Sequence, residues 1–177
     1  MVRKRVKKKM AKKSKFNGLM SSQFKRPNKW KLTKSLTFKT DLFENEIALF
    51  KKHKVDLKWN KDTLTVPKGY ITDMASVPRA AWAFIAPFDV ARAAVVHDIL
   101  YEKINTQYKI VNESAAAEDG PATKKEREVY RKIADDIFLE GMHASEPAVP
   151  SWKKYSAYWA VRMFGRWAIN SSAKRIV

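Results

Sequence analysis

The apolar run from Asp89 to Tyr101 constrains the fold of this chain more than any other feature. It begins with an aspartate, a residue type that caps helices, and contains almost no polar residue before His97. A helix that is apolar nearly all round is stable only when other elements cover most of its surface. The run therefore predicts a central, mostly buried helix around which the rest of the chain packs.

Shorter patterns on either side predict the surrounding layers. Alternating apolar and polar residues are typical of half-buried strands, and apolar residues three and four apart are typical of helices. The order of these patterns predicts an α+β fold, with a small antiparallel sheet followed by three or more packed α-helices. Strands are expected near 36–38, 55–59 and 63–67, helices over 42–52, 123–143 and 151–168, and a loop over 104–122.

The two last helices carry distinct apolar stripes, which are interpreted as core faces. In the first of them, the inward residues are expected to be Val129, Ile133, Ile137 and Phe138. In the second, the stripe consists of Trp152, Tyr155, Trp159 and Met163. Because Arg162 and Arg166 lie beside this second stripe, it is interpreted as core with a basic rim rather than as a base-stacking surface.

The net charge of +18 is unevenly distributed. Residues 1–40 contain 15 basic residues and no acidic one, whereas the rest of the chain has 21 basic and 18 acidic residues. Residues 1–34 are therefore predicted to form a basic flexible arm, followed by a single globular α+β domain at 35–177. The densest cations of the arm are Arg3, Lys4, Arg5, Lys7, Lys8, Lys9, Lys12, Lys13 and Lys15.

Such an arm is expected to bind DNA or an acidic protein surface through charge, without reading base sequence. The alternative is a solvated tail that aids solubility. The chain has no cysteine, which excludes disulfides, thiolate zinc sites and a cysteine nucleophile. No apolar signal segment follows the basic start, and no apolar run approaches the roughly 20 residues of a membrane span. We therefore expect a soluble protein made in a cytoplasm.

A longer motif extends over Val66–Arg79 and reads Val-Pro-Lys-Gly-Tyr-Ile-Thr-Asp-Met-Ala-Ser-Val-Pro-Arg. With Ala94–Tyr101, Arg131–Phe138 and Val161–Gly165, it resembles the pattern of an uncharacterised, phage-associated family known as domain of unknown function thirteen fifty-three. The resemblance covers about residues 60–166 in the right order. It implies a gene of a tailed phage or prophage, and hence a virion protein made in the bacterial host cytoplasm. The basic arm is not part of the family pattern.

The polar residues of this motif are typical of a compact turn, because Asp and Ser side chains hydrogen-bond readily to nearby backbone amides. Arg79 can pair with Asp73, and Pro78 fixes the entry to the next helix. We interpret these residues as structural, with the alternative that the carboxylate and hydroxyl line a site. The motif residues in question are Gly69, Thr72, Asp73, Ser76, Pro78 and Arg79.

A second group of polar residues lies on the predicted central helix. His97 and Tyr101 are four residues apart and share a helix face, whereas Asp98 points about 100° away. His97 therefore needs another partner, and Asp135 on the following helix is the natural acceptor, which would fix the tautomer of the imidazole. Asp98 is left for a cation or an arginine. Either these residues form a buried network that docks the helices, or they form a catalytic site.

These two helices also resemble the catalytic helix pair of the secreted and parvoviral phospholipases A2. The resemblance implies that His97 is the general base, Asp98 a calcium ligand, Asp135 the residue that orients His97, and Tyr101 a supporting hydrogen-bond donor. Those enzymes complete the calcium shell with a glycine-rich loop, for which this chain offers only Gly69 upstream.

The leading hypothesis is a non-enzymatic structural protein of a bacteriophage virion. Its arm would contact DNA or an acidic virion surface, its partners would be other virion proteins, and it would need no cofactor. The alternative is a calcium-dependent, phospholipase A2-like hydrolase that uses His97 and Asp135.

Overall fold

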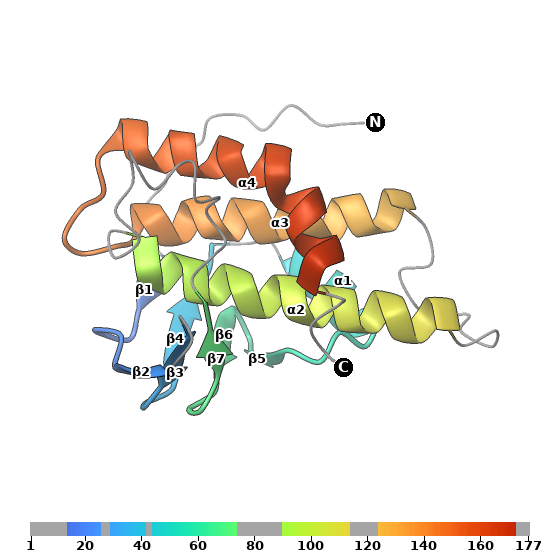
Figure 1. Ribbon diagram of the computed structural model, residues 1–177. Helices are drawn as coiled ribbons and strands as arrows, with labels where there is room; N and C mark the ends of the chain where they lie inside the picture. Colours follow the sequence, from blue (N-terminus) through green and yellow to red (C-terminus); the bar gives the residue numbers. More distant parts are fainter. Residues whose placement is uncertain (1–13, 26–28, 42–43, 74–89, 114–123, 173–177) are drawn as a thin grey trace.

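The computed structural model describes residues 14–25, 29–41, 44–73, 90–113 and 124–172. Helices α2, α3 and α4 lie in stacked layers, and the strands lie on the side of α2 away from α4 (Figure 1). The α+β prediction is confirmed. In chain order the elements are β1 (Lys15–Phe16), β2 (Ser22–Lys25), β3 (Lys29–Leu32), β4 (Leu36–Lys39), α1 (Glu44–Lys52), β5 (Lys58–Asn60), β6 (Thr63–Val66), β7 (Ile71–Thr72), α2 (Ala91–Glu113), α3 (Lys124–His143) and α4 (Ser151–Ser172).

Two small antiparallel sheets make up the strand layer, with the orders β1-β4-β6-β5 and β2-β3-β7. In the first sheet Leu36 pairs with Val66 and Phe38 with Leu64, and all four side chains are buried. Strands β5 and β6 form a hairpin whose turn holds Lys61 at φ 52°. The hairpin and its neighbouring strand were both expected from the alternating apolar pattern.

The prediction of a flexible arm is wrong from Lys15 onward. Strand β1 pairs with β4, and the β2–β3 hairpin pairs with β7, so this segment belongs to both sheets. Phe16 packs on Phe38 with 4.7 Å between ring centroids, and Leu32 is buried in the core. The open edges of the two sheets offer backbone hydrogen bonds. Pairing with them therefore orders a segment whose lysine-rich composition suggested disorder.

Helix α2 is the central helix, as predicted. Its residues Val96 and Leu100 are buried in a core shared with the first sheet, α1 and α3. The helix continues to Glu113, so the prediction of a loop from residue 104 is wrong. Ile104 repeats the four-residue spacing of Val96 and Leu100 and is itself buried, which explains why the helix extends this far.

Helices α3 and α4 cover the other side of α2. Phe138 of α3 and Val161 of α4 are buried in a second core with Ala94 of α2. The expectation that Val129 faces inward is wrong, because it is 49% exposed, whereas its neighbour Tyr130 and Ile133 one turn later are buried.

The aromatic stripe of α4 does not face the core, contrary to the prediction. Small or medium-sized residues occupy the inward face instead, among them Ala157, Val161 and Gly165. Small residues on the inward side let α4 approach its neighbours closely. The bulky stripe lies on the opposite side of the helix and therefore points to solvent. Its members are 56%, 48%, 59% and 65% exposed, in the order Trp152, Tyr155, Trp159 and Met163.

Candidate functional site

Asp135 lies in the middle of α3 and has no exposed surface. Its carboxylate accepts three hydrogen bonds from two other helices. His97 Nε2 and the Tyr101 hydroxyl, both on α2, lie 2.8 Å and 2.5 Å from Oδ1. One terminal guanidinium nitrogen of Arg162, on α4, lies 2.7 Å from Oδ2. We call these four residues the Asp135 network, and it joins all three long helices.

The helical spacing of the sequence builds this arrangement. His97 and Tyr101 are one turn apart on α2, and their ring centroids are 4.0 Å apart. Phe138, one turn after Asp135 on α3, covers the imidazole with 5.1 Å between ring centroids. Gly165 brings α4 so close that a Cβ atom there would be 2.8 Å from the Tyr101 hydroxyl oxygen. The predicted contact between His97 and Asp135 is therefore present, with an aromatic lining.

The network keeps Asp135 ionised. Burial alone would raise the pKa of this carboxyl, but the hydrogen bond from His97 and its electrostatic attraction, followed by the hydrogen bonds from Tyr101 and Arg162, outweigh burial and lower the pKa below 3.8. Burial, followed by the charge of Asp135, raises the pKa of the Tyr101 hydroxyl. Tyr101 is therefore a neutral donor to a charged acceptor at neutral pH.

The ionised carboxylate determines the tautomer of His97. A carboxylate can only accept, so the proton between the two groups belongs to His97 Nε2. In the neutral imidazole, Nδ1 then carries a lone pair. This nitrogen is buried and has no hydrogen-bond partner in the part of the chain that the structure describes. His97 as a whole is 2% exposed.

A buried cation lies near the network. Arg131 precedes Asp135 by four residues on α3 and is 4% exposed. One terminal nitrogen donates to Glu128 at 2.9 Å, whereas its Nε and its other terminal nitrogen have no partner among the described residues. The charge of Arg131 acts on Tyr101 and opposes the burial that raises the pKa of that hydroxyl. Sequence reasoning assigned no role to Arg131, although its spacing from Asp135 places both on one helix face.

Arg162 was also missed as a site residue, because it was assigned to the basic rim of α4. Its pKa is raised: burial would lower it, but the hydrogen bond to Asp135 and the charge of Asp135 prevail. The pattern of α4 alone could not show that this arginine points to α3. The stripe that seemed to mark the inward face marks the outward one.

Asp98 points away from Asp135, as its helical position predicts. It accepts a hydrogen bond from the hydroxyl of Thr72, which is buried at the end of β7. The neighbouring Tyr70 hydroxyl has a raised pKa, first because of burial and then because of the charges of Asp98 and Glu102. Asp98 thus joins α2 to the second sheet.

A calcium shell is not assembled by the residues that the structure describes. Within the described ranges, no three His, Asp or Glu side chains gather as metal ligands. Calcium takes six to eight oxygens, and Asp98 with Thr72 offers a carboxylate and a hydroxyl. Gly69 has a φ of 88° in the turn before Tyr70 and accounts for the glycine of the motif. Asp73 is exposed after β7, and Ser76, Pro78 and Arg79 lie outside the described residues.

The chain matches the family model described as "Protein of unknown function (DUF1353)" over residues 48–161. This span covers more than half of the sequence. The chain belongs to this family. No curated protein and no solved structure matches the chain. His97, Tyr101 and Asp135 lie within the DUF1353 span, and Arg162 follows its last residue.

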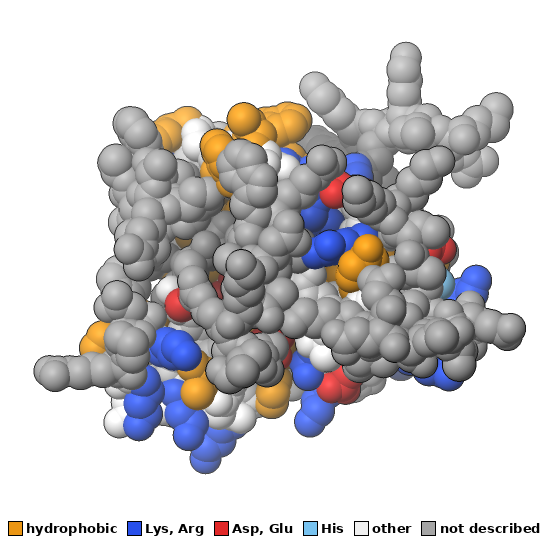
Figure 2. All heavy atoms as spheres, turned by 45° about the vertical axis from the view of Figure 1, so that its right-hand side comes forward, with side chains coloured by type: hydrophobic (Ala, Val, Ile, Leu, Met, Phe, Trp, Pro, Cys, Tyr) orange, Lys and Arg blue, Asp and Glu red, His pale blue; other side chains and the backbone are white. Residues whose placement is uncertain are grey.

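The predicted basic residues precede the DUF1353 span. Of the nine cations assigned to the arm, Lys15 is described and is exposed on β1, and the other eight lie outside the described residues. The β2–β3 hairpin adds exposed lysines on one face, since Lys25 pairs with Lys29 and Gln23 with Lys31. Figure 2 shows Lys and Arg side chains gathered along the lower edge of the molecule, at the height of the strands in Figure 1.

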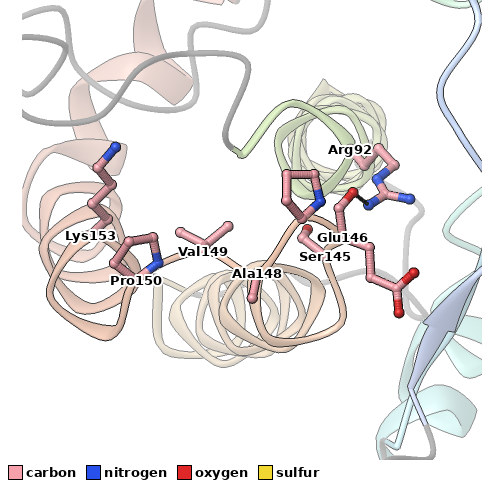
Figure 3. A pocket seen from close by; sticks show the side chains of 8 residues that line it. Arg92, Ser145, Glu146, Ala148, Val149, Pro150 and Lys153 are labelled. Carbon is pink, nitrogen blue, oxygen red and sulfur yellow. Dashed lines mark hydrogen bonds between the residues drawn. The ribbon is translucent and has the colours of Figure 1, made fainter.

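One pocket of about 370 Å³ lies between the start of α2 and the loop before α4 (Figure 3). Arg92 borders it and donates to the carbonyl oxygens of Gly18 at 3.0 Å and Glu146 at 2.6 Å. None of the residues that line this pocket belongs to the Asp135 network. The Asp135 network and this pocket therefore lie at separate positions in the DUF1353 fold.

Proposed function

We propose that this protein is a hydrolase in which His97 acts as a general base on a carboxylic ester. One observation carries the proposal: His97 Nδ1 is buried without a partner among the described residues, while Nε2 donates to Asp135. A buried nitrogen with an unused lone pair costs stability unless it meets a ligand or a reactant. An imidazole oriented by a carboxylate is also the arrangement that general-base chemistry requires.

In the proposed reaction, His97 Nδ1 takes a proton from water while the water oxygen attacks the ester carbonyl carbon. When the bond to the leaving oxygen breaks, the imidazolium gives its proton to that oxygen, which yields an acid and an alcohol. Asp135 stays ionised and is a positioning residue that stabilises the imidazolium. The buried charge of Arg131 would stabilise the oxyanion. Water and ester must enter beside Nδ1, so the site has to open during turnover.

The ester is proposed to be that of a phospholipid, as the resemblance to phospholipases A2 implies. The proposal includes a dependence of the hydrolysis rate on calcium, which the experiment below measures. No step is assigned to the metal, since Asp98 and Thr72 supply too few oxygens for its shell.

The test is the release of fatty acid from phospholipid vesicles, with calcium and with a chelator. His97→Gln is the decisive variant, because a glutamine amide can still donate to Asp135 but offers no base. We expect the rate to fall by about 10²–10⁴-fold. Glu140→Gln is the matched control, because Glu140 is a buried carboxylate on α3, like Asp135, and accepts from Ser14, Thr40 and the Asp41 backbone instead of from His97. If wild type releases no more fatty acid than His97→Gln under either condition, the proposal fails.

The distribution of charge favours a second function, and we propose that the protein is also a component of a phage particle. Fifteen basic residues and no acidic one occur in residues 1–40. Exposed lysines of the β2–β3 hairpin continue this charge on the folded domain. The phage association implied by the sequence motif supplies the context, and the basic segment would contact DNA or an acidic virion surface.

Deleting residues 1–13 tests this second function and leaves β1 intact. We expect the deletion to remove most binding to DNA and to purified particles. Binding of the intact chain should weaken with salt, with a slope of roughly −0.9 for each phosphate contacted on duplex DNA. Equal retention of the two proteins at low salt would contradict the role of the arm. Absence of the protein from gradient-purified particles, measured by mass spectrometry, would contradict the particle role.

A further inference from the structure

The outward side of α4 presents a row of large apolar side chains to solvent. We call it the α4 face and define it as Trp152, Tyr155, Trp159 and Met163. Steps of three, four and four residues keep these side chains on one side of the helix. Figure 2 shows apolar side chains gathered at the top of the molecule, at the height that α4 occupies in Figure 1.

The α4 face is not a loosely packed part of the core. Ala157 and Val161, which lie on the opposite side of the helix, are fully buried against α2 and α3. Trp159 lies between them in sequence but is 59% exposed. Since side chains on opposite sides of one helix cannot both reach the same core, the aromatic side remains available to an external surface. Contiguous exposed apolar patches of this kind mark interaction sites.

The charge of this part of the chain identifies the kind of surface. Residues 151–177 contain six basic residues and no acidic one, and one of the six, Arg162, is bound to Asp135 on the inner side of the helix. At the start of the helix the ammonium of Lys153 lies 5.7 Å from the ring centroid of Trp152. An aromatic stripe with a cation beside it, on a segment that contains no carboxylate, complements a surface that is apolar inside and negatively charged outside.

We propose that the α4 face docks this protein on an anionic phospholipid surface. Trp and Tyr are enriched where hydrocarbon meets headgroups, because their rings are apolar and their N–H and O–H groups remain hydrated. Each nearby cation adds attraction to anionic lipid. No helix in the described ranges is long and apolar enough to cross a bilayer.

Two other occupants fit the same face less well. A second copy packed by two-fold symmetry would bring Lys153 and its neighbours toward identical cations, with no carboxylate on α4 to pair with them. A protein partner would need an apolar groove that fits a convex helix and is lined by acids, whereas a lipid headgroup layer adapts to a helix laid on it. The inference does not depend on hydrolysis, because binding is measured without turnover.

The experiment uses the full chain with vesicles of phosphatidylcholine alone or mixed equally with phosphatidylglycerol, at an ionic strength of about 0.15 M. Sedimentation gives the partition, and quenching of tryptophan by brominated lipid reports whether α4 inserts. The test variant is Trp152→Ala/Trp159→Ala, which changes exposed residues and leaves the basic N-terminal segment intact. The matched control is Phe24→Ala/Ile71→Ala, which removes exposed apolar groups from the second sheet.

We expect wild type and the sheet variant to bind mixed vesicles alike, with quenching by brominated lipid. The α4 variant should bind at least about tenfold more weakly. Lys153→Gln should weaken binding to mixed vesicles by about fivefold. If the α4 variant binds as wild type does, the basic N-terminal segment accounts for binding and the inference is wrong. If wild type does not bind or is not quenched, the α4 face does not insert into lipid, and the inference is also wrong. Unchanged circular dichroism of each variant shows that folding is intact.

Discussion

Two buried carboxylates lie five residues apart on α3, and they are held in opposite ways. Asp135 accepts from His97, Tyr101 and the guanidinium of Arg162. Glu140, which is 6% exposed, accepts from the hydroxyls of Ser14 and Thr40 and from the backbone amide of Asp41. Both side chains have three donors, but only Asp135 has a permanent cation among them.

The electrostatic consequence has opposite signs. Burial raises the pKa of Glu140, and its neutral donors do not reverse this rise. Burial acts in the same direction on Asp135, yet the hydrogen bonds and the neighbouring charges lower its pKa. Neutral donors alone therefore do not offset the effect of burial on a carboxyl of this helix. The pKa of Asp135 is lowered first by the hydrogen bond from His97 and its electrostatic attraction, and then by the hydrogen bonds from Tyr101 and Arg162. Glu140, which attaches the N-terminal segment to α3, has neutral donors alone.

The largest effect is expected when the centre of the network is removed. Asp135→Ala deprives His97, Tyr101 and Arg162 of their common acceptor and leaves a cation without its partner. We expect the free energy of unfolding to fall by about 3–5 kcal/mol. Chemical denaturation at neutral pH measures it. A loss below about 1 kcal/mol would show that the network does not hold the three helices together.

The pH dependence of stability should separate the two carboxylates. Folding lowers the pKa of Asp135, so its contribution is full above pH 3.8 and is lost as the pH falls through the folded-state pKa. Folding raises the pKa of Glu140, so its contribution is full below pH 4.5 and is lost as the pH rises through the folded-state pKa. Denaturation across this pH range measures the free energy of unfolding of both variants. Asp135→Ala should reduce the loss of stability that occurs as the pH falls, and Glu140→Gln should reduce the loss that occurs as the pH rises. Parallel curves for both variants would contradict the comparison.

A smaller effect is expected from crowding one donor of the network. In Gly165→Ala the new Cβ would lie 2.8 Å from the Tyr101 hydroxyl and push it from Asp135. We expect a loss of about 1–3 kcal/mol. Tyr101→Phe lacks the crowded oxygen, so Gly165→Ala should cost less in that background. Equal costs in the two backgrounds, measured by a double-mutant cycle, would show that the contact with Tyr101 is not what the glycine permits.

The smallest effect is expected at the other carboxylate. Glu140→Gln keeps one acceptor oxygen for Ser14 and the backbone amide of Asp41, and its new amide group can donate to the Thr40 hydroxyl. The variant also removes a carboxylate that has no cation beside it. The free energy of unfolding at neutral pH should change by less than about 1 kcal/mol, and we expect a small gain in stability instead of a loss. A loss as large as that of Asp135→Ala would show that charge at residue 140 is as well compensated as at residue 135.

Local periodicity predicted much of the fold and the central contact of the site. Helical spacing placed His97 and Tyr101 on one face and directed Asp98 elsewhere, and both placements agree with the structure. The pairing of His97 with Asp135 needed only two adjacent helices and the rule that buried polar groups find partners. The roles of these residues remain predictions.

The failures have physical causes that a single sequence hides. The α4 stripe shows that periodicity separates two sides of a helix but does not say which side is buried, since Ala157 and Val161 form an apolar side as well. The sheet-paired segment after Lys15 was missed because its backbone partners lie far away in sequence. Arg162 was assigned to the rim because the sequence does not say which side of α4 packs against α3.

The state of His97 is the most direct test of the account, and nitrogen NMR of the folded chain at neutral pH measures it. An ionised Asp135 can only accept, so the proton between the two groups is on Nε2, and a neutral imidazole then has its lone pair on Nδ1. We predict the ¹⁵N shift of an unprotonated nitrogen for Nδ1, and loss of this tautomer preference in Asp135→Ala. A proton on Nδ1, alone or in an imidazolium, would contradict the claim that the network presents a free base.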